Sequence, residues 1–319
     1  MSSVNKRWPA LAVAVLAFAV AAPARSDDLA LLPDLRQAPV GCPGGYGGDP
    51  AKCTDWDVCA VHDADAPNGR CITAGSMKAV RLRFTSSEDN VGDGPLLLYG
   101  SRDNTRQKTM SVRQAFQTRE GGSIPTSFQA AQHATTTSTY YEPAKMHEHW
   151  HLMGFEHFEL RTPDGGTLVT DRKNGFCLGD RYPTPDAKQL AHAVPNDESP
   201  QGQLGRFLAK NMCGMRNPDA LTVIEGISVG RGDDYRYDVD FQWLDITTLP
   251  SGTYDVVNTV NSDRTLVESN YENNSSSIAI SVQWPSGARV APSLITSPPT
   301  VKLLRSCPGS AKCAISTKN

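Results

Sequence analysis

The sequence predicts an all-β protein, an antiparallel β-sandwich-like domain with long loops and few short helices. Two observations carry this prediction. Short segments rich in β-branched and aromatic residues recur along the chain, and Gly, Pro, Asn and Asp separate them. Helical periodicity is weak everywhere except over residues 186–192. The expected strands lie at residues 80–84, 95–100, 157–162, 167–170, 221–230, 237–247, 252–261 and 277–284.

The first 24 residues predict a signal peptide. Lys6 and Arg7 form a short positive segment, residues 11–22 are an uninterrupted apolar run, and Ala-Pro-Ala at residues 22–24 offers small residues for cleavage. An uncleaved membrane anchor is the less favoured alternative, because the run is short for a bilayer and no later segment is long enough to span one. We therefore expect a secreted or otherwise extracytoplasmic protein.

The charge of the chain limits the class of partner. Loss of Lys6 and Arg7 with the signal peptide would change the formal net charge from −3 to −5. Nucleic acid is therefore not expected as a partner, since phosphates require a basic surface. The mild acidity is compatible with a cationic partner.

The eight cysteines predict disulfides, because an exported chain leaves the reducing cytosol. The first four have uneven spacing and no neighbouring histidine pair, so two local bridges are favoured over a structural zinc site. Their three possible pairings stay open. Bridges are also expected within each later pair. The three sets are Cys42, Cys53, Cys59 and Cys71, then Cys177 and Cys213, then Cys307 and Cys313.

A histidine cluster predicts a metal site. His147, His149 and His151 alternate with Glu148 and Trp150. In a strand, residues two apart share a face, so the three imidazoles would project together toward one ion. Imidazole nitrogens favour copper or zinc. The alternatives are a zinc site, structural or hydrolytic, and a solvent-facing strand without a metal.

Five segments, in order, resemble the catalytic domain of the lysyl oxidase family. They are VRLRF followed by NVGDGPLLLYG, HEHWHLM, RKNGFCLGD, GDDYRYDVDFQWLDIT and LVESNYENN. The resemblance covers residues 78–285, which we take as the catalytic domain. Residues 25–77 are then a cysteine-rich lead-in, and residues 286–319 a C-terminal tail with Cys307–Cys313. The chain is identified as a bacterial-type member of the family.

The resemblance implies the site residues. His147, His149 and His151 would be copper ligands, and Lys173 and Tyr235 would form the cofactor lysine tyrosylquinone. Counting back from the QW of the fourth segment favours Tyr235 over the nearby Tyr237. His157 and Asp233 are candidates for the general base that removes the substrate's α-proton, by their nearness in sequence to these segments. The acids Asp233, Asp234, Asp238 and Asp240 could attract a cationic amine.

The resemblance also implies a structural calcium site. The acidic and Asn-rich turn LVESNYENN offers hard oxygen donors, which calcium prefers. An acidic segment near the N-terminus would complete the site. The alternative is an Asn-rich turn that binds no ion. The expected ligands are Asp34, Leu35, Glu268, Asn270, Asn273 and Asn274.

The leading hypothesis is therefore a copper-dependent amine oxidase. Such an enzyme would convert primary amines or peptidyl lysine to aldehydes with O₂ and release NH₃ and H₂O₂. The main alternative is a non-catalytic secreted β module that binds copper or calcium, and a hydrolytic zinc enzyme is third. Departures from the animal enzymes, such as YYEPAKM before the histidines and Phe241 in place of a cysteine, leave the substrate groove and the disulfide pattern open.

Overall fold

The computed structural model describes residues 30–118, 123–145, 147–171, 173 and 175–314. The signal peptide expected at residues 1–24 lies outside this range. Antiparallel strands form five sheets in the described part, and the helices are few and short, which confirms the all-β prediction.

A five-stranded sheet and a three-stranded sheet enclose the main core. The first has the spatial order β12 (Thr167–Thr170), β11 (Glu156–Arg161), β18 (Gly252–Val260), β19 (Ser275–Gln283) and β20 (Thr300–Cys307). The second has the order β17 (Trp243–Asp245), β4 (Ala79–Phe84) and β3 (Trp56–Val61). Phe84 and Phe158 meet edge to face between the two sheets, with ring centroids 5.3 Å apart. Side chains of both inner faces fill the space, as in a β-sandwich.

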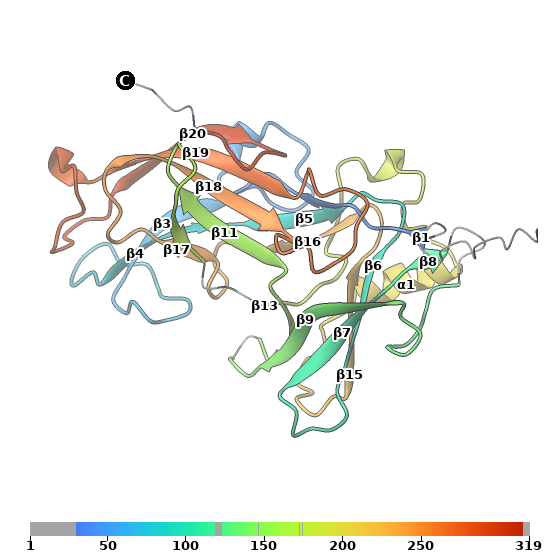
Figure 1. Cartoon of the computed structure of the whole chain (residues 1–319). Coiled ribbons are helices and arrows are strands. Elements are labelled where there is room, and N and C mark those ends of the chain that lie inside the picture. The colour runs from blue at the N-terminus through green and yellow to red at the C-terminus, as the bar shows by residue number, and fades with distance from the viewer. Residues whose placement is uncertain (1–29, 119–122, 146, 172, 174, 315–319) are drawn as a thin grey trace, which may run out of the picture.

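A six-stranded sheet forms the second part of the molecule. Its order is β13 (Gly175–Phe176), β10 (His149–Met153), β9 (His133–Glu142), β7 (Thr109–Ala115), β6 (Leu96–Ser101) and β15 (Thr222–Ile227). Figure 1 shows β18, β19 and β20 on one side of the molecule and β7, β9 and β15 on the other, with β13 between them. The histidine strand β10 therefore lies beside β13 where the two parts meet.

A smaller sheet of four strands contains a wholly buried polar strand. Its order is β14 (Tyr182–Pro183), β16 (Arg231–Tyr235), β5 (Ser86–Asn90) and β2 (Leu35–Gln37), and a separate pair joins β1 (Ala30–Leu31) to β8 (Gln117–Thr118). Every residue of β5, SSEDN in sequence, is buried. Polar side chains in such a strand must find partners inside the protein.

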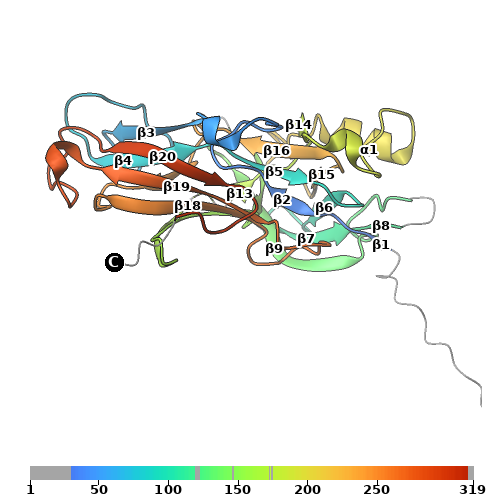
Figure 2. The same cartoon turned by 90° about the horizontal axis from the view of Figure 1, so that it is seen from above.

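The α-helix lies outside the segment whose periodicity suggested one. Residues 186–192 contain only the 3₁₀ turn η3 (Ala187–Gln189), whereas α1 spans Pro200–Leu208. Ser199 caps α1, since its hydroxyl accepts from the Gly202 N–H at 3.2 Å, and Pro200 occupies the first turn. Two further 3₁₀ turns are η2 (Pro50–Lys52) and η4 (Pro285–Gly287). Figure 2 shows α1 at the end of the molecule opposite to β3 and β4.

The lead-in and the tail both add strands to the sheets. Strand β2 pairs with β5, and β3 pairs with β4. The tail contributes β20 to the edge of the five-stranded sheet, where β20 pairs with β19. No helix in the described part of the chain has the length and apolarity needed to cross a membrane.

Four disulfides connect the eight cysteines. The first set, whose pairing the sequence left open, forms Cys42–Cys53 and Cys59–Cys71. The expected bridges Cys177–Cys213 and Cys307–Cys313 are present. The Cys59–Cys71 bridge joins β3 to the loop that leads from β3 to β4.

Candidate metal and amine site

The three histidines converge, but not from a single strand. Strand β10 begins at His149, and Glu148 before it has φ +48°, in the left-handed region. Three alternating residues of a straight strand would place the outer Cα atoms roughly 13 Å apart, too far for both to reach one ion. The prediction of one flat face is therefore wrong in this detail. The kink at Glu148 brings His147 back over His149 and His151.

The imidazole nitrogens lie close enough to share one ion. His151 Nε2 is 2.8 Å from His149 Nε2 and 3.3 Å from His147 Nδ1. One nitrogen from each ring can be chosen so that all three lie within 4.8 Å of one another. Burial lowers the pKa of His149 to about 4 and also lowers that of His151. Both rings are then neutral at pH 7, the form that binds a metal.

The outer atoms of the cluster have partners that orient the rings. His147 Nε2 lies 3.2 Å from Asp240 Oδ2, and His151 Nδ1 lies 3.3 Å from the Tyr140 hydroxyl. Gly175 of β13 packs against the same ring: a Cβ on it would lie 2.7 Å from His151 Nδ1. Carboxylates and hydroxyls behind histidine ligands fix the ring orientation in metal sites.

The back of β10 is tied to the Cys177–Cys213 bridge. Trp150 is fully buried, its N–H donates to the Cys213 carbonyl at 2.9 Å, and its indole donates to the Asn217 carbonyl at 3.0 Å. The disulfide connects this support to the segment that follows Lys173. The histidines and the lysine are therefore positioned by one packed unit.

Lys173 and Tyr235 lie next to each other. Lys173 Nζ is 5.0 Å from the centroid of the Tyr235 ring and 5.1 Å from that of Phe176. The Phe176 ring meets the Tyr235 ring edge to face at 5.0 Å. Lys173 is buried, and burial lowers its pKa to about 8 against the opposing effect of Glu156 and other acids. Its amine is therefore partly neutral near physiological pH, which a nucleophile requires.

The Tyr235 hydroxyl is held by two acceptors. It donates to the Cys177 carbonyl at 3.2 Å and lies 3.3 Å from Asp233 Oδ2. Burial raises the pKa of Tyr235 well above its usual value, and the charge of Asp233 adds to the rise. Asp233 itself accepts from the Gly179 N–H at 2.9 Å and lies 3.4 Å from the Arg181 guanidinium. The ring is fixed in position with its hydroxyl protonated.

Two buried glutamates near the lysine were missed by the sequence analysis. Glu156 accepts from Gln37 and Ser86, and burial raises its pKa to about 7. Glu88 is fully buried, and burial together with the neighbouring charge of Glu156 raises its pKa well above the usual value. Lys173 is the nearby buried cation whose charge favours ionised Glu156. Polar strand sequence alone gave no sign that these acids are internal.

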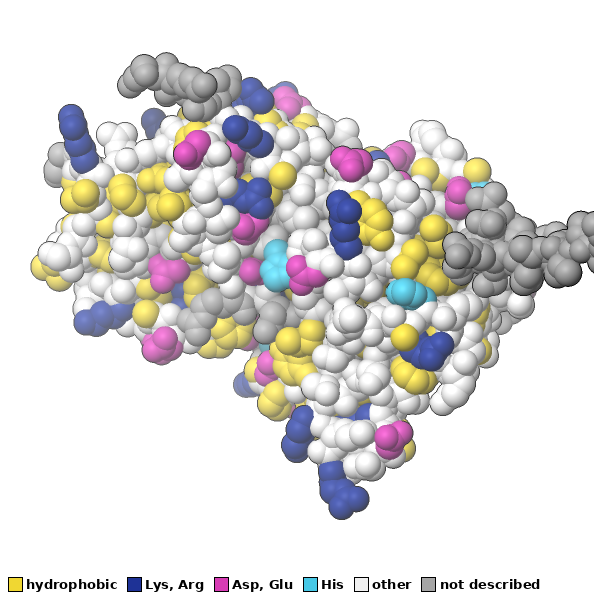
Figure 3. All heavy atoms as spheres, in the orientation of Figure 1, with side chains coloured by type: hydrophobic (Ala, Val, Ile, Leu, Met, Phe, Trp, Pro, Cys, Tyr) yellow, Lys and Arg dark blue, Asp and Glu magenta, His cyan; other side chains and the backbone are white. Residues whose placement is uncertain are grey.

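The histidines, Lys173 and Tyr235 line one cleft made of two adjoining pockets. The pockets have volumes of about 250 and 480 Å³ and share His147, His151, Lys173 and Asp240. Tyr235 lines the larger one. Figure 3 shows acidic and basic side chains interspersed over the described atoms of one face of the molecule.

Some of the candidate residues named from the sequence line the cleft and others do not. Asp233, Asp234, Asp238 and Asp240 all line the larger pocket. His157 does not line either pocket, and its ring lies 3.7 Å from Asp171 and 3.9 Å from Asp263. Tyr237 is half-buried, and the Arg83 guanidinium lies over its ring. Of the pair Tyr235 and Tyr237, only Tyr235 adjoins the lysine.

Most of the expected calcium ligands also come together. The Leu35 N–H donates to Glu268 Oε2 at 2.8 Å, and Asn274 Nδ2 donates to Glu268 Oε1 at 2.7 Å. Asn273 Nδ2 donates to Asp34 Oδ1 at 2.8 Å. The amide oxygens of Asn273 and Asn274 are buried without a hydrogen-bond partner. Burial raises the pKa of Glu268 to about 7.

Asn270 is the exception among these residues. Its amide oxygen accepts from the Glu272 N–H at 3.0 Å, within its own turn. The cluster around Glu268 therefore contains five of the six residues named from the sequence.

Sequence comparison relates part of the chain to known proteins. Residues 213–287 match the family model described as Lysyl oxidase. Lysyl oxidase homolog 3 of Homo sapiens is 29% identical over 129 residues, which are 40% of this chain and 14% of that protein. Lysyl oxidase homolog 2 of Gallus gallus and Lysyl oxidase homolog 4 of Mus musculus are each 30% identical over 129 residues, 40% of this chain and 13% and 14% of those proteins.

The matches cover a limited share of this chain and of its relatives. The chain covers only 13–14% of the length of these relatives. The family match contains Tyr235 and the turn around Glu268, whereas the histidines and Lys173 precede it.

Proposed function

This chain is related to the lysyl oxidase family, and we propose on that premise that it is a copper-dependent amine oxidase. Its substrate would be a primary amine, either small or the side chain of a peptidyl lysine. One molecule each of amine, O₂ and water would give an aldehyde, NH₃ and H₂O₂. The observation that carries the proposal is the buried Lys173 amine over the Tyr235 ring, in the cleft that the three histidines line.

The residues fit the two groups that the family implies. His147, His149 and His151 would hold copper, since they offer converging nitrogens and two of the rings are neutral at pH 7. Lys173 and Tyr235 would be the source of lysine tyrosylquinone. Copper supplies redox chemistry with O₂, and the quinone supplies an electron-accepting carbonyl.

The chain's own residues prepare this chemistry in three ways. Burial keeps part of the Lys173 amine neutral at neutral pH. The Phe176 ring packs against the Tyr235 ring and fixes its orientation, and the Cys177 carbonyl accepts a hydrogen bond from the Tyr235 hydroxyl. Asp233 lies in the cleft beside that hydroxyl, so we assign it the removal of the substrate's α-proton in preference to His157.

The second implied ion is calcium, in a structural role at the cluster around Glu268. The fit rests on the buried amide oxygens of Asn273 and Asn274, which have no partner, and on two carboxylates, Asp34 and Glu268. A cation would satisfy these oxygens together. Asn270 would join only after its turn rearranges.

Export to an oxidising compartment is part of the proposal. Four disulfides, two of them within residues 42–71, are consistent with folding outside the cytosol.

Peptide mapping by mass spectrometry tests the proposal directly. The protein would be matured with copper in air and digested without prior reduction of the cross-link. We expect one peptide pair joined through Lys173 and Tyr235. The Lys173→Arg variant should bind copper but lack the joined pair and release no H₂O₂ with a primary amine. Tyr237→Phe is the matched control and should keep both.

The opposite result has a definite meaning. Separate, unmodified Lys173 and Tyr235 peptides from folded, copper-loaded protein would contradict the oxidase. The remaining hypothesis would then be the non-catalytic copper- or calcium-binding module. Metal analysis that finds zinc in place of copper would favour the hydrolytic alternative.

A further inference from the structure

The segment 212–216 runs alongside the start of the histidine strand. The Trp150 N–H donates to the Cys213 carbonyl at 2.9 Å, and the Arg216 N–H donates to the Glu148 carbonyl at 2.6 Å. The later residue of one segment meets the earlier residue of the other, so the two segments are antiparallel. Segment 212–216 therefore lies in the position of a short neighbouring strand at the beginning of β10.

This segment contributes one residue to the back of β10 and one to the cleft. Cys213 is fully buried and packs with Trp150 behind the strand. Met212, the residue before it, is 45% exposed and lines the larger pocket together with all three histidines. Met212 therefore belongs to the histidine cleft, although it lies more than 60 residues after the histidines in the sequence.

The backbone of the segment is fixed in an unusual conformation. Cys213, Gly214 and Arg216 have φ angles of +46°, +66° and +57°, all in the left-handed region. Two of these are not glycine, and such residues stay there only when their surroundings determine the conformation. Here the hydrogen bonds to β10 and the Cys177–Cys213 bridge do so. Met212 is thus attached to a rigid support.

The Met212 thioether is the soft ligand of this cleft. All eight cysteines are in disulfides, so the chain has no free thiolate. Met77 and Met110 are buried in the core. Among the methionines that the structure describes, only Met212 lines the two pockets of the cleft. A thioether selects monovalent copper, which is a soft ion, whereas imidazole suits copper and zinc alike.

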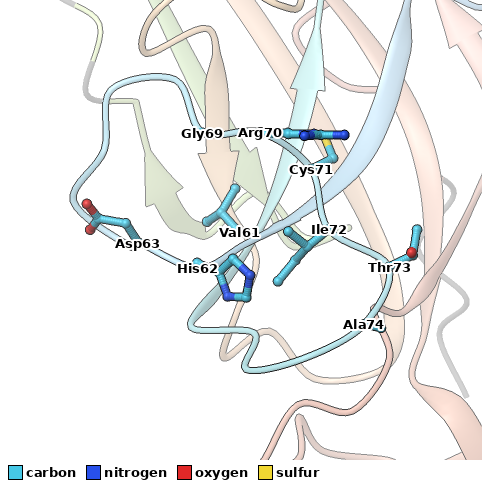
Figure 4. Close-up of a pocket in the computed structure, with 9 residues that line it drawn as sticks. All are labelled: Val61, His62, Asp63, Gly69, Arg70, Cys71, Ile72, Thr73 and Ala74. Atoms are coloured by element: carbon cyan, nitrogen blue, oxygen red, sulfur yellow. The ribbon is translucent and has the colours of Figure 1, made fainter.

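A histidine in a separate pocket lacks this combination. His62 lines a pocket of about 570 Å³, and no methionine lines it. Figure 4 shows the His62 ring at this pocket with Val61 and Ile72 nearby. Its Nδ1 lies 2.7 Å from the Ser76 carbonyl oxygen. His62 is therefore an internal reference for adventitious binding of a soft ion to a lone imidazole.

We propose that Met212 and the cleft histidines form a binding site for monovalent copper. The ligand set would combine the thioether sulfur with imidazole nitrogens, and it differs from the three-histidine set proposed for divalent copper. The thioether would let the chain take up copper in its reduced form, which nitrogen ligands alone select less strongly. This inference rests on the proposed copper site, and it requires neither the quinone nor turnover.

Silver(I) and zinc(II) are the two probes that test the site. Silver(I) is a soft monovalent ion that keeps its oxidation state in air, and zinc(II) binds imidazoles without a thioether. Metal-free protein with ¹³C-labelled methionine methyl groups would be titrated with each ion in chloride-free buffer. NMR would follow the methyl and imidazole signals of the wild type, Met212→Leu and Met215→Leu. Met215 is the matched control, because it is 38% exposed on the same segment but does not line the cleft.

We expect silver to shift the Met212 methyl signal and the cleft imidazole signals before it affects His62. Met212→Leu should weaken silver binding at least about tenfold, since disturbing even the support of a ligand costs that much. Its zinc affinity should stay at the wild-type value, which also shows that the cleft is folded. Met215→Leu should change neither affinity.

Three results would overturn the monovalent site: unchanged silver affinity in Met212→Leu, an equal loss in Met215→Leu, or silver that shifts the His62 signals first. These results would leave the proposed oxidase intact, because zinc binding and the Lys173–Tyr235 cross-link are measured separately. Absence of the cross-link would contradict the oxidase and leave the silver result standing. If neither ion shifts the cleft imidazole signals, the proposed copper site and the monovalent site both fail.

Discussion

Replacing Gly175 by alanine measures how closely β13 packs on the histidine cluster. A Cβ on Gly175 would lie 2.7 Å from His151 Nδ1, 2.8 Å from His151 Cβ and 2.9 Å from Tyr140 Cε1. Ordinary contacts begin near 3.4 Å, so the closest pair overlaps by about 0.7 Å. All three atoms belong to side chains packed against β13. The imidazole or the strand must therefore move.

The size of the effect follows from this overlap. Added bulk in a packed interior costs about 1–3 kcal/mol, and a loss of at least about 2 °C in Tm is expected. Displacement of the His151 ring should weaken copper binding by about 10–100-fold, as happens when the support of a metal-binding histidine is disturbed. The first quantity is measured by thermal unfolding of the metal-free protein, and the second by titration against a copper-binding competitor.

Gly47→Ala provides the matched control. A Cβ there would meet only Pro185 Cβ at 3.6 Å, an ordinary contact, so both quantities should stay at wild-type values. If Gly175→Ala also keeps the wild-type Tm and copper affinity, the close packing of His151 against residue 175 is refuted.

Three further predictions concern protons and ions. Because the pKa of Lys173 is about 8, the neutral fraction of its amine rises about fivefold from pH 7 to pH 8. The rate of cross-link formation, followed by mass spectrometry, should rise by the same factor. A rate that does not change with pH would contradict a lysine that is mostly protonated at pH 7. The pKa of Glu268 is raised from 4.5 to about 7, so the calcium-free fold loses this group's stabilisation as pH rises through 7. Calcium should therefore raise Tm more at pH 8 than at pH 5, with Glu268→Gln reducing the difference; an equal rise at both pH values would argue against a calcium site at Glu268. Asp240→Asn should weaken copper binding by about 10–100-fold through His147, and unchanged affinity in the competitor titration would show that this contact does not orient the ring.

Local sequence patterns were sufficient for most strands. The turn residues at 163–166 join β11 and β12 as expected, and Gly165 has φ +99°, which a residue with a side chain rarely adopts. The segments at 80–84, 252–261 and 277–284 correspond to β4, β18 and β19. Residues 237–247, in contrast, form only the short β17, because the bend at Phe241 interrupts the extended chain.

Long-range features were beyond these patterns. The left-handed Glu148 is set by the bonds around it: the Arg216 N–H and the Tyr141 hydroxyl both donate to its carbonyl. The sequence SSEDN of β5 suggests a polar surface segment, yet its position between β16 and β2 buries it completely. The helix at Pro200–Leu208 begins with a Ser-Pro signal that a search for apolar periodicity overlooks.

The histidines, lysine and tyrosine could be named from the sequence because each lies in a compact motif. The contact of Pro67 with Phe241 and Trp243 could not be predicted, since it joins segments more than 170 residues apart. Spacing within the cysteine-rich segment predicted bridges but not which surface they would shape.

Strand β20 protects the edge of the five-stranded sheet. It pairs with β19 from Ser277 to Gln283, and the Cys307–Cys313 bridge closes the chain just beyond it. Removal of the chain from residue 300 onward would leave the backbone N–H and C=O groups of the nine-residue strand β19 open to another molecule, a known route to self-association. Light scattering of a protein shortened at residue 299 would detect this. A polypeptide fused after β20 would leave the edge covered, which makes that end the safer place for a label.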